Sequence, residues 1–137
     1  MPLTNATAAA ALVAITARIN QGVSPGKIKL YTANYTLLLG VITLNDPPFT
    51  TPTEASPSVT NLDVDPELTT TGLADGTAAA FQFTDSNDVV HWQETGAGAV
   101  GTSNALMIVS TTAVETGQQL KVISCSLSMP TAFANLP

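Results

Sequence analysis

The sequence predicts a small, mainly β domain: a β-sandwich of jelly-roll-like type that begins with one α-helix. Hydrophobic and polar residues alternate with a period of two over most of the second half, which is typical of half-buried strands. Turn residues recur at the short intervals expected for antiparallel hairpins. Helical periodicity is confined to the N-terminal end, so the pattern does not favour a parallel sheet with crossover helices. The 137 residues provide for one domain.

We divide the chain into an N-terminal helix and connector (1–24), a β-sandwich domain (25–130) and a C-terminal tail (131–137). The helix is expected over residues 4–20, where Thr4 or Asn5 can cap the first N–H groups and Gly22 follows the last periodic position. Alanines favour this helix, and Pro25 prevents its continuation.

Both sides of the predicted helix are apolar. Leu12, Ile15 and Ile19 share one side, whereas the opposite side, with Val13 and Ala17, is hardly more polar. A helix of this kind needs cover on two sides. We expect the domain's own sheet to cover one side and a neighbouring subunit to cover the other.

The first half of the β domain is predicted to hold three strands. Residues 27–32 alternate, with Ile28 and Leu30 on one face. Residues 35–44 form a continuous apolar run that indicates burial on both faces, with a bulge at Gly40. The third strand is expected over residues 58–64.

Two connections interrupt these strands. Four prolines between residues 46 and 58 remove too many N–H donors for a sheet interior, so this segment is interpreted as an extended surface arm or loop. Residues 66–76 are interpreted as a second loop.

The second half is predicted to be a series of hairpin strands. They are expected at residues 77–84, 89–94, 105–110 and 119–129. A tight turn at 85–88 and a glycine-punctuated loop at 96–101 connect them. In the last strand Ile123, Cys125, Leu127 and Met129 are expected to face one way and the intervening serines the other.

Composition argues against several kinds of partner. The net charge is -6 and the four basic residues are scattered, so no basic surface is available for nucleic acid. The apolar stretch at 8–15 is too short to span a bilayer and lacks the basic flank of a signal peptide, so no membrane partner is expected. A single cysteine, Cys125, gives neither an internal disulfide nor a thiolate metal site, and no cofactor is expected.

The sole histidine, His91, is the one candidate for catalysis. Asp85 or Asp88, across the predicted turn, together with a serine would complete a hydrolytic triad. However, no G-x-S-x-G motif is present. We therefore interpret His91 as a strand residue and predict that the protein is not an enzyme.

An acidic cluster in the segment NLDVDPEL, where the third predicted strand meets the second loop, could meet one hard cation. It consists of Asp63, Asp65 and Glu67, at alternate positions. Pro66 and the lack of the glycine and distal glutamate depart from the EF-hand pattern. Solvated loop charges are the favoured interpretation, and cation binding stays open.

The glycines at 96, 98 and 101 superficially match a phosphate-binding loop. No lysine follows them and no helix opens after Gly101, so a hairpin connection is the better interpretation. Cys125, on the apolar face of the last strand, is expected to be buried and unreactive.

Several stretches together resemble a group of small structural proteins of tailed bacteriophages. They are ATAAAALVAITARINQG, PGKIKLYTA, LLLGVITLNDPPF and GTAAAFQFTDSNDVVHWQETGAG, followed by the serine-rich last strand. The likeness covers nearly the whole chain, as a layout without a catalytic signature. It implies a virion component, made in the host cytoplasm, that acts as a capsid cement or decoration protein with a jelly-roll-like fold. The proline-rich stretch from Pro47 to Pro57 departs from the shorter loop expected in this group.

This resemblance implies the major capsid protein or other virion proteins as partners, and a homo-oligomer, a dimer or trimer, at the shell. The residues expected at such interfaces are Leu12, Val13, Ile15, Ile19, Pro47, Pro48, Phe49, Phe133 and Leu136. Two alternatives stay open. One is a neck or tail-fibre component, and the other is a carbohydrate-binding or cell-surface-binding module with Trp92, Tyr31 and Tyr35 as stacking platforms.

Overall fold

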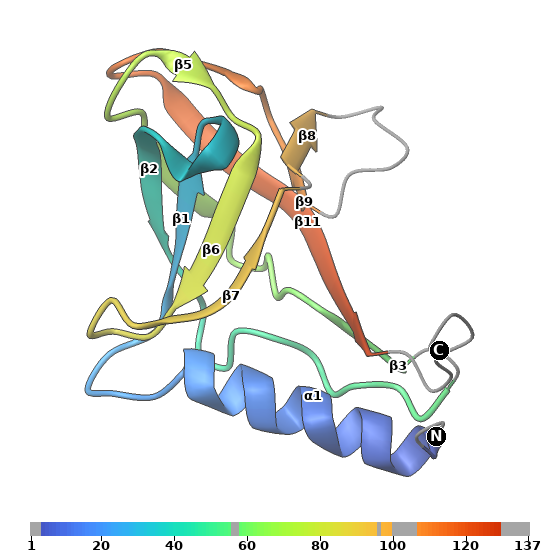
Figure 1. Ribbon diagram of the computed structural model, residues 1–137. Coiled ribbons are helices and arrows are strands. Elements are labelled where there is room, and N and C mark those ends of the chain that lie inside the picture. Colours follow the sequence, from blue (N-terminus) through green and yellow to red (C-terminus); the bar gives the residue numbers. More distant parts are fainter. Residues whose placement is uncertain (1–3, 56–57, 96, 100–106, 130–137) are drawn as a thin grey trace.

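A computed structural model describes residues 4–55, 58–95, 97–99 and 107–129. The described chain is mainly β, with one α-helix and mostly antiparallel sheets. The helix α1 (Asn5–Ile19) lies across one end of the sheets, below them in Figure 1. The prediction of a mainly β chain with one N-terminal helix is therefore confirmed.

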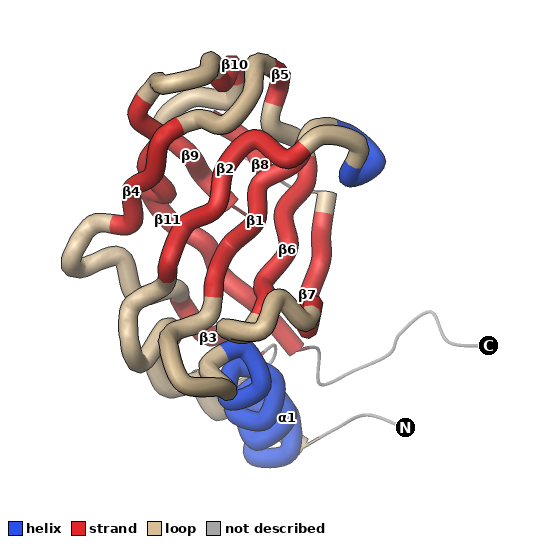
Figure 2. The backbone as a smooth tube through the Cα atoms, turned by 90° about the vertical axis from the view of Figure 1, so that its left-hand side faces the viewer, coloured by secondary structure: helices blue, strands red, loops and turns tan. Residues whose placement is uncertain are grey.

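One sheet has four antiparallel strands in the order β2-β1-β6-β7, which lie side by side in Figure 2. Their bounds are β1 (Lys27–Tyr31), β2 (Leu38–Thr43), β6 (Ala80–Thr84) and β7 (Val90–Glu94). A short 3-10 turn, η1 (Ala33–Tyr35), joins β1 to β2. Ile28 and Leu30 are fully buried, as their alternation with the lysines predicts.

The second sheet is built around the longest strand, β11 (Gln119–Met129). It has the order β3-β11-β9-β8, and β4 also pairs with β11. The other bounds are β3 (Ser58–Asn61), β4 (Leu68–Thr71), β8 (Ala97–Ala99) and β9 (Met107–Val109). The pair β8–β9 is parallel, and a separate short pair joins β5 (Gly76–Thr77) to β10 (Ala113–Val114).

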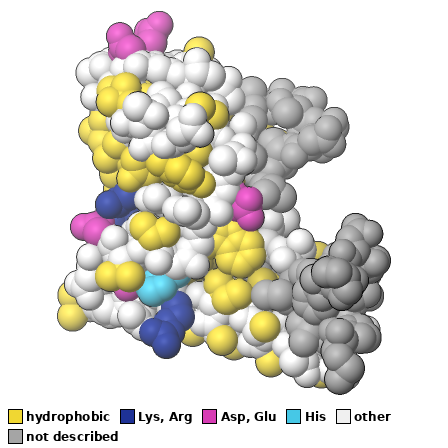
Figure 3. Space-filling view, viewed as in Figure 1, with side chains coloured by type: hydrophobic (Ala, Val, Ile, Leu, Met, Phe, Trp, Pro, Cys, Tyr) yellow, Lys and Arg dark blue, Asp and Glu magenta, His cyan; other side chains and the backbone are white. Residues whose placement is uncertain are grey.

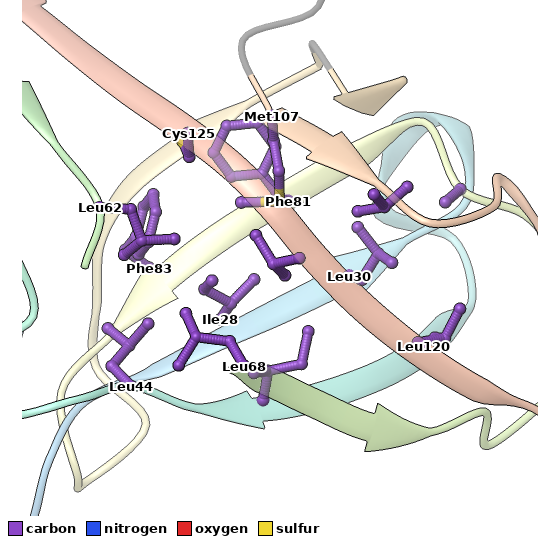
Figure 4. Packing of buried hydrophobic residues seen from close by; sticks show 14 of the residues in the cluster. Ile28, Leu30, Leu44, Leu62, Leu68, Phe81, Phe83, Met107, Leu120 and Cys125 are labelled. Carbon is purple, nitrogen blue, oxygen red and sulfur yellow. The ribbon is translucent and has the colours of Figure 1, made fainter. Parts of the chain in front are cut away.

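Both sheets contribute side chains to one buried hydrophobic cluster (Figure 4). Phe81 and Phe83 on β6 are the largest of its fully buried side chains, and their rings pack edge to face at 5.7 Å. The second sheet supplies Leu68, Met107 and Leu120. Leu12 and Ile19 of α1 belong to the same cluster, so the helix packs on the β domain within the chain.

Two strands lie where the sequence predicts loops. β4 occupies part of the expected 66–76 loop, and β8 occupies part of the glycine-punctuated loop. Each of these strands is held by hydrogen bonds to another strand. β4 pairs with β11, and β8 pairs with β9. The hydrophobic pattern of a segment gives no information on which other strand it pairs with, so these two strands were not predicted.

Two other predictions need adjustment in detail. The strand expected from residue 35 begins at Leu38, because η1 takes up the first residues, and a register shift falls beside Gly40 as predicted. In β11 the register slips between Val122 and Ser124. Leu120 and Val122 are therefore buried before the slip and Cys125 and Leu127 after it, so the prediction that Ile123 faces the core with Cys125 is wrong.

Candidate interaction surface

The helix α1 begins and ends where its sequence provides caps. The side chain of Thr4 accepts a hydrogen bond from the Thr7 backbone N–H at 3.1 Å, as an N-cap residue should. Asn20 is the C-cap, and Gly22 follows with a φ of +113°, which glycine adopts at little cost. The cap residues thus fix a four-turn helix with one side against the sheets.

The buried side of α1 is part of the core. Leu12 and Ile19 have no exposed surface, Ala8 and Ala9 are buried beside them, and Ile15 is partly buried against the cluster. Leu12 and Ile19, which the sequence places at an intermolecular interface, therefore have nothing to offer a partner. The reason is that the sheet end and β3 cover this side completely.

The exposed side of α1 carries small apolar residues. Ala6, Ala10, Val13 and Ala17 are all exposed, Val13 by 50%. Their spacing of four, three and four residues places them along one line on the helix. This line is the second apolar side that the sequence predicts to need cover.

A groove of about 180 Å³ lies beside this line, between α1 and the proline-rich segment. Its lining residues are Val13, Thr16, Ala17, Asn20, Pro47, Pro48 and Phe49. Four of the predicted interface residues, Val13 and Pro47 to Phe49, therefore come together although they are distant in sequence. We call the exposed line of α1 and this groove the helix–proline surface.

The polar groups of the groove already have partners within the chain. The Thr16 hydroxyl donates to the backbone oxygen of Leu12 at 3.0 Å. Asn20 donates from Nδ2 to Asp46 Oδ1 at 2.9 Å, which ties the end of α1 to the start of the proline-rich segment. Because these groups are satisfied, what the groove offers a partner is chiefly apolar contact.

The proline-rich segment is not a free arm. The backbone N–H groups of Thr50 and Thr53 donate to carbonyl oxygens of Asn61 and Val59, at 2.8 and 2.9 Å, so the segment runs along β3. Phe49 is only 7% exposed, and its ring packs edge to face on Phe83 at 5.2 Å. Pro48 is buried as well, and only Pro47 of this pair of prolines remains exposed. The prediction of an extended surface arm is thus wrong for Phe49, which is anchored in the core. Phe133 and Leu136 lie outside the described residues.

The structure brings the candidate triad residues His91 and Asp85 together. His91 Nε2 lies 2.9 Å from Asp85 Oδ2, and the Asp85 side chain is only 1% exposed. Hydrogen bonding from His91 holds the pKa of Asp85 below its usual value, against the opposing effect of burial. Among the described residues no serine hydroxyl is hydrogen-bonded to His91.

Asp88 is used elsewhere. Its Oδ1 accepts from both Lys27 and Lys29 of β1, each at 3.2 Å. These bonds hold the pKa of Asp88 below its usual value. Asp88 therefore ties the turn to β1 and is not part of the His91 pair.

The three acidic residues Asp63, Asp65 and Glu67 make separate contacts and do not share one site. Glu67 pairs with Lys121 at 2.7 Å, and Asp63 Oδ1 accepts from the Asp65 backbone N–H at 3.1 Å. In the described part of the chain no three histidine, cysteine or acidic side chains gather as metal ligands. No observation here favours a cation at these positions.

Two further candidates belong to the packing of the domain. Trp92 is partly buried against the core cluster, and its indole Nε1 is buried without a partner among the described residues. Burial raises the pKa of the Cys125 thiol to about 12, and the charge of Glu94 adds to this rise. The expected burial of Cys125 is confirmed.

One arrangement was missed by sequence reasoning. Asp85 accepts four hydrogen bonds and thereby joins the β6–β7 turn, β7 and the segment after α1. The turn signature Asp85-Ser86-Asn87-Asp88 indicates the local bonds, but nothing in it indicates the contact with Gln21.

No family model, curated protein or solved structure matches this chain. In the described residues no helix has the length and hydrophobicity needed to cross a membrane.

Proposed function

We propose that this chain is a structural protein of a virion, most specifically a capsid cement or decoration protein that bridges subunits without covalent bonds. The observation that carries the proposal is the helix–proline surface. Its α1 line and Pro47 are exposed and apolar, and the side chains of Thr16 and Asn20 in the groove already bond within the chain. A surface of this kind is suited to contact with protein rather than to chemistry on a small molecule.

The residues of the exposed line favour contact with another helix or a flat protein surface. Ala6, Ala10 and Ala17 are small, so a partner's backbone can approach closely. Val13 stands between them at the rim of the groove. Because these side chains have little freedom to lose, ordering them on binding costs little conformational entropy.

Charge supports a homo-oligomer through the same surface. The chain carries a net charge of -6, so copies repel one another. None of the ten acidic residues lies within α1, so two copies can meet along this helix without bringing its own carboxylates together. Charged side chains are also sparse over the face drawn in Figure 3. We propose a dimer or trimer whose partner in the virion is the major capsid protein or another virion protein.

The strand order supports a β-sandwich with jelly-roll-like crossovers as the finer description of the fold. The pair β1–β2 lies in one sheet, β3 and β4 in the other, β6–β7 again in the first, and β8, β9 and β11 in the second. Successive pairs thus alternate between sheets, which is how such folds bury two inner faces.

A carbohydrate-binding role has weaker support. Tyr31 and Tyr35 are partly exposed, but their rings pack edge to face at 5.8 Å, so neither presents a flat platform with its neighbour. Trp92 is held against the core. A neck or tail-fibre position stays an alternative placement within the virion.

The test is quantitative mass spectrometry of purified virions, with binding of the purified chain to empty heads as the second readout. The proposal predicts that the protein is present in high copy number and that Val13→Asp abolishes binding to heads. Val23→Asp is the matched control, because Val23 is fully exposed and lies outside the groove. Low copy number would favour the neck or tail. Absence from the particle, or equal binding of the two variants, would overturn the proposal.

A further inference from the structure

The segment that follows α1 contacts the β6–β7 turn at Asp85, a buried carboxylate, and at its neighbour Ser86. We propose that Asp85 is an acid-sensitive latch. Its ionised carboxylate holds the middle of the connector (residues 20–26), Gln21 and Gly22, against the turn, and protonation of this carboxylate releases these two residues. The inference concerns the isolated chain and does not depend on the proposed virion role.

The carboxylate accepts hydrogen bonds from three parts of the chain. Oδ1 accepts from the backbone N–H groups of Asn87 and Val89, at 2.9 and 3.1 Å. Oδ2 accepts from His91 Nε2 at 2.9 Å and from Gln21 Nε2 at 3.4 Å. An ionised carboxylate can only accept, so the His91 nitrogen that faces it carries the hydrogen.

The connector makes further contacts with the same turn at Gln21 and Gly22. Its ends are held elsewhere, because Asn20 donates to Asp46 and the Gly26 carbonyl oxygen accepts from the Leu44 N–H, each at 2.9 Å. The Gln21 carbonyl oxygen accepts from the backbone N–H and the hydroxyl of Ser86, at 3.5 and 3.4 Å. Gly22 approaches Ser86 so closely that a Cβ there would lie 1.9 Å from its hydroxyl oxygen. Gly26 is similarly confined between the backbone oxygens of Ile19 and Thr84.

These connector contacts depend on the conformation of the turn. The two hydrogen bonds to the Gln21 carbonyl are long, so they are weak, and Ser86 is positioned by the short bonds at its neighbour Asp85. A protonated carboxyl group has one donor and weaker acceptors, so it cannot satisfy four donors. Loss of the ionised form therefore loosens the turn and the connector together.

The direction of the pH dependence follows from the contacts. The hydrogen bond from His91 and the backbone N–H groups lower the pKa of Asp85, although burial opposes them. A carboxyl whose folded pKa is lowered stabilises the fold fully above its unfolded value of about 3.9 and loses this contribution as pH falls through the folded value. The latch is therefore closed near neutral pH and opens in acid.

Other charged groups surround the latch and need to be separated from it. They lie in the segment after β2, on β1, in the turn and on β7, and are Asp46, Lys27, Lys29, Asp88 and His91. Asp88 lies in the same turn as Asp85, and its bonds to Lys27 and Lys29 hold its pKa below the usual value. A variant of Asp88 is thus the necessary control.

The contacts that hold α1 itself do not titrate. Leu12 and Ile19 are apolar and fully buried. The helix is therefore expected to stay on the core when the latch opens, while the connector and the turn become free to exchange.

Hydrogen exchange of the full chain between pH 7 and pH 2 tests the latch. The protection of the Ser86, Asn87 and Val89 amides should be lost as the pH falls below the ordinary value for an aspartate, about 3.9. At the same pH, amides of Phe81 and Val122 in the central strands should remain protected. Loss of protection in all five amides at one pH would mean global unfolding and would overturn the inference.

Variants identify the group that titrates. Asp85→Asn should show low protection of the turn already at pH 7 and no further acid step, whereas Asp88→Asn should keep the step. If Asp85→Asn does not fold, His91→Ala provides the second test, because removal of the main cause of the lowered pKa should move the step to higher pH. An acid step that persists in Asp85→Asn, or one that does not move in His91→Ala, would refute the latch.

Discussion

At the scale of single residues, two neighbours on α1 show how one helix serves both the core and the surface. Leu12 is fully buried in the cluster, whereas Val13 is half exposed at the groove. Successive residues on a helix point about 100° apart, so adjacent positions can belong to opposite sides. A difference in stability between variants at these two positions measures this division directly.

Leu12→Ala should lower the free energy of unfolding by about 2–5 kcal/mol, the usual cost of truncating a buried leucine. Val13→Ala should change it by less than about 0.5 kcal/mol, as is usual for surface substitutions. Chemical denaturation monitored by circular dichroism measures both values. Similar losses at the two positions would contradict the division of the helix.

Cys125 should be inert in the folded protein. Burial raises the pKa of its thiol to about 12, so the reactive thiolate is scarce at pH 8. Iodoacetamide should therefore label Cys125 only after unfolding in denaturant, as intact-mass spectrometry can show. Rapid labelling of the native chain would place the thiol at the surface.

The sequence predicts such residues well where a local rule decides their role. The cap at Thr4, the turn at 85–88 and the burial of Phe81 and Phe83 follow from neighbours in sequence. The burial of Phe49 could not be predicted from its neighbours in sequence, because it depends on a distant partner, Phe83. The contact of Gln21 with Asp85 joins residues 64 positions apart and has no local signal.

At the scale of secondary-structure elements, regular alternation identified strands but not their register. The serines of β11 predict a single uninterrupted alternation, yet the slip between Val122 and Ser124 moves Ile123 out of line with Cys125. A β-bulge of this kind adds one residue to one strand and needs no particular side chain. For a similar reason β4, a run of threonines paired with β11, could not be told from a loop.

The packing of α1 against the sheet depends on a glycine. A Cβ at Gly26 would lie 2.3 Å from the backbone oxygen of Ile19 and 2.6 Å from that of Thr84. Gly26→Ala should therefore force the helix end and β6 apart and destabilise the protein by about 3 kcal/mol, in the upper range for overpacking.

Gly117→Ala is the matched comparison for this prediction. Gly117 has a φ of +84° but no atom within 4 Å of its missing Cβ, so the substitution should cost only about 1–2 kcal/mol of backbone strain. Thermal unfolding of the two variants shows which of them is the less stable, and Gly26→Ala is expected to be. A variant at Gly26 as stable as the wild type would refute the close approach.

At the scale of the whole molecule, three properties occur together. The chain has a net charge of -6, one apolar core shared by α1 and both sheets, and an exposed helix side without acidic residues. The charge, the apolar core and the lack of acidic residues on the helix could be predicted from composition and periodicity. The groove could not, because it forms where Val13 and Ala17 meet Pro47 and Pro48 from a different part of the chain.

The central claim is that the helix–proline surface binds protein, and the mass of the purified chain in solution tests it most directly. Light scattering coupled to size-exclusion chromatography should give two or three times the 14.1 kDa chain mass for the wild type and for Val23→Asp. Val13→Asp, with unchanged circular dichroism, should give the mass of a single chain. A wild-type protein that remains at 14.1 kDa at high concentration, or a Val13→Asp variant with the wild-type mass, would contradict the account.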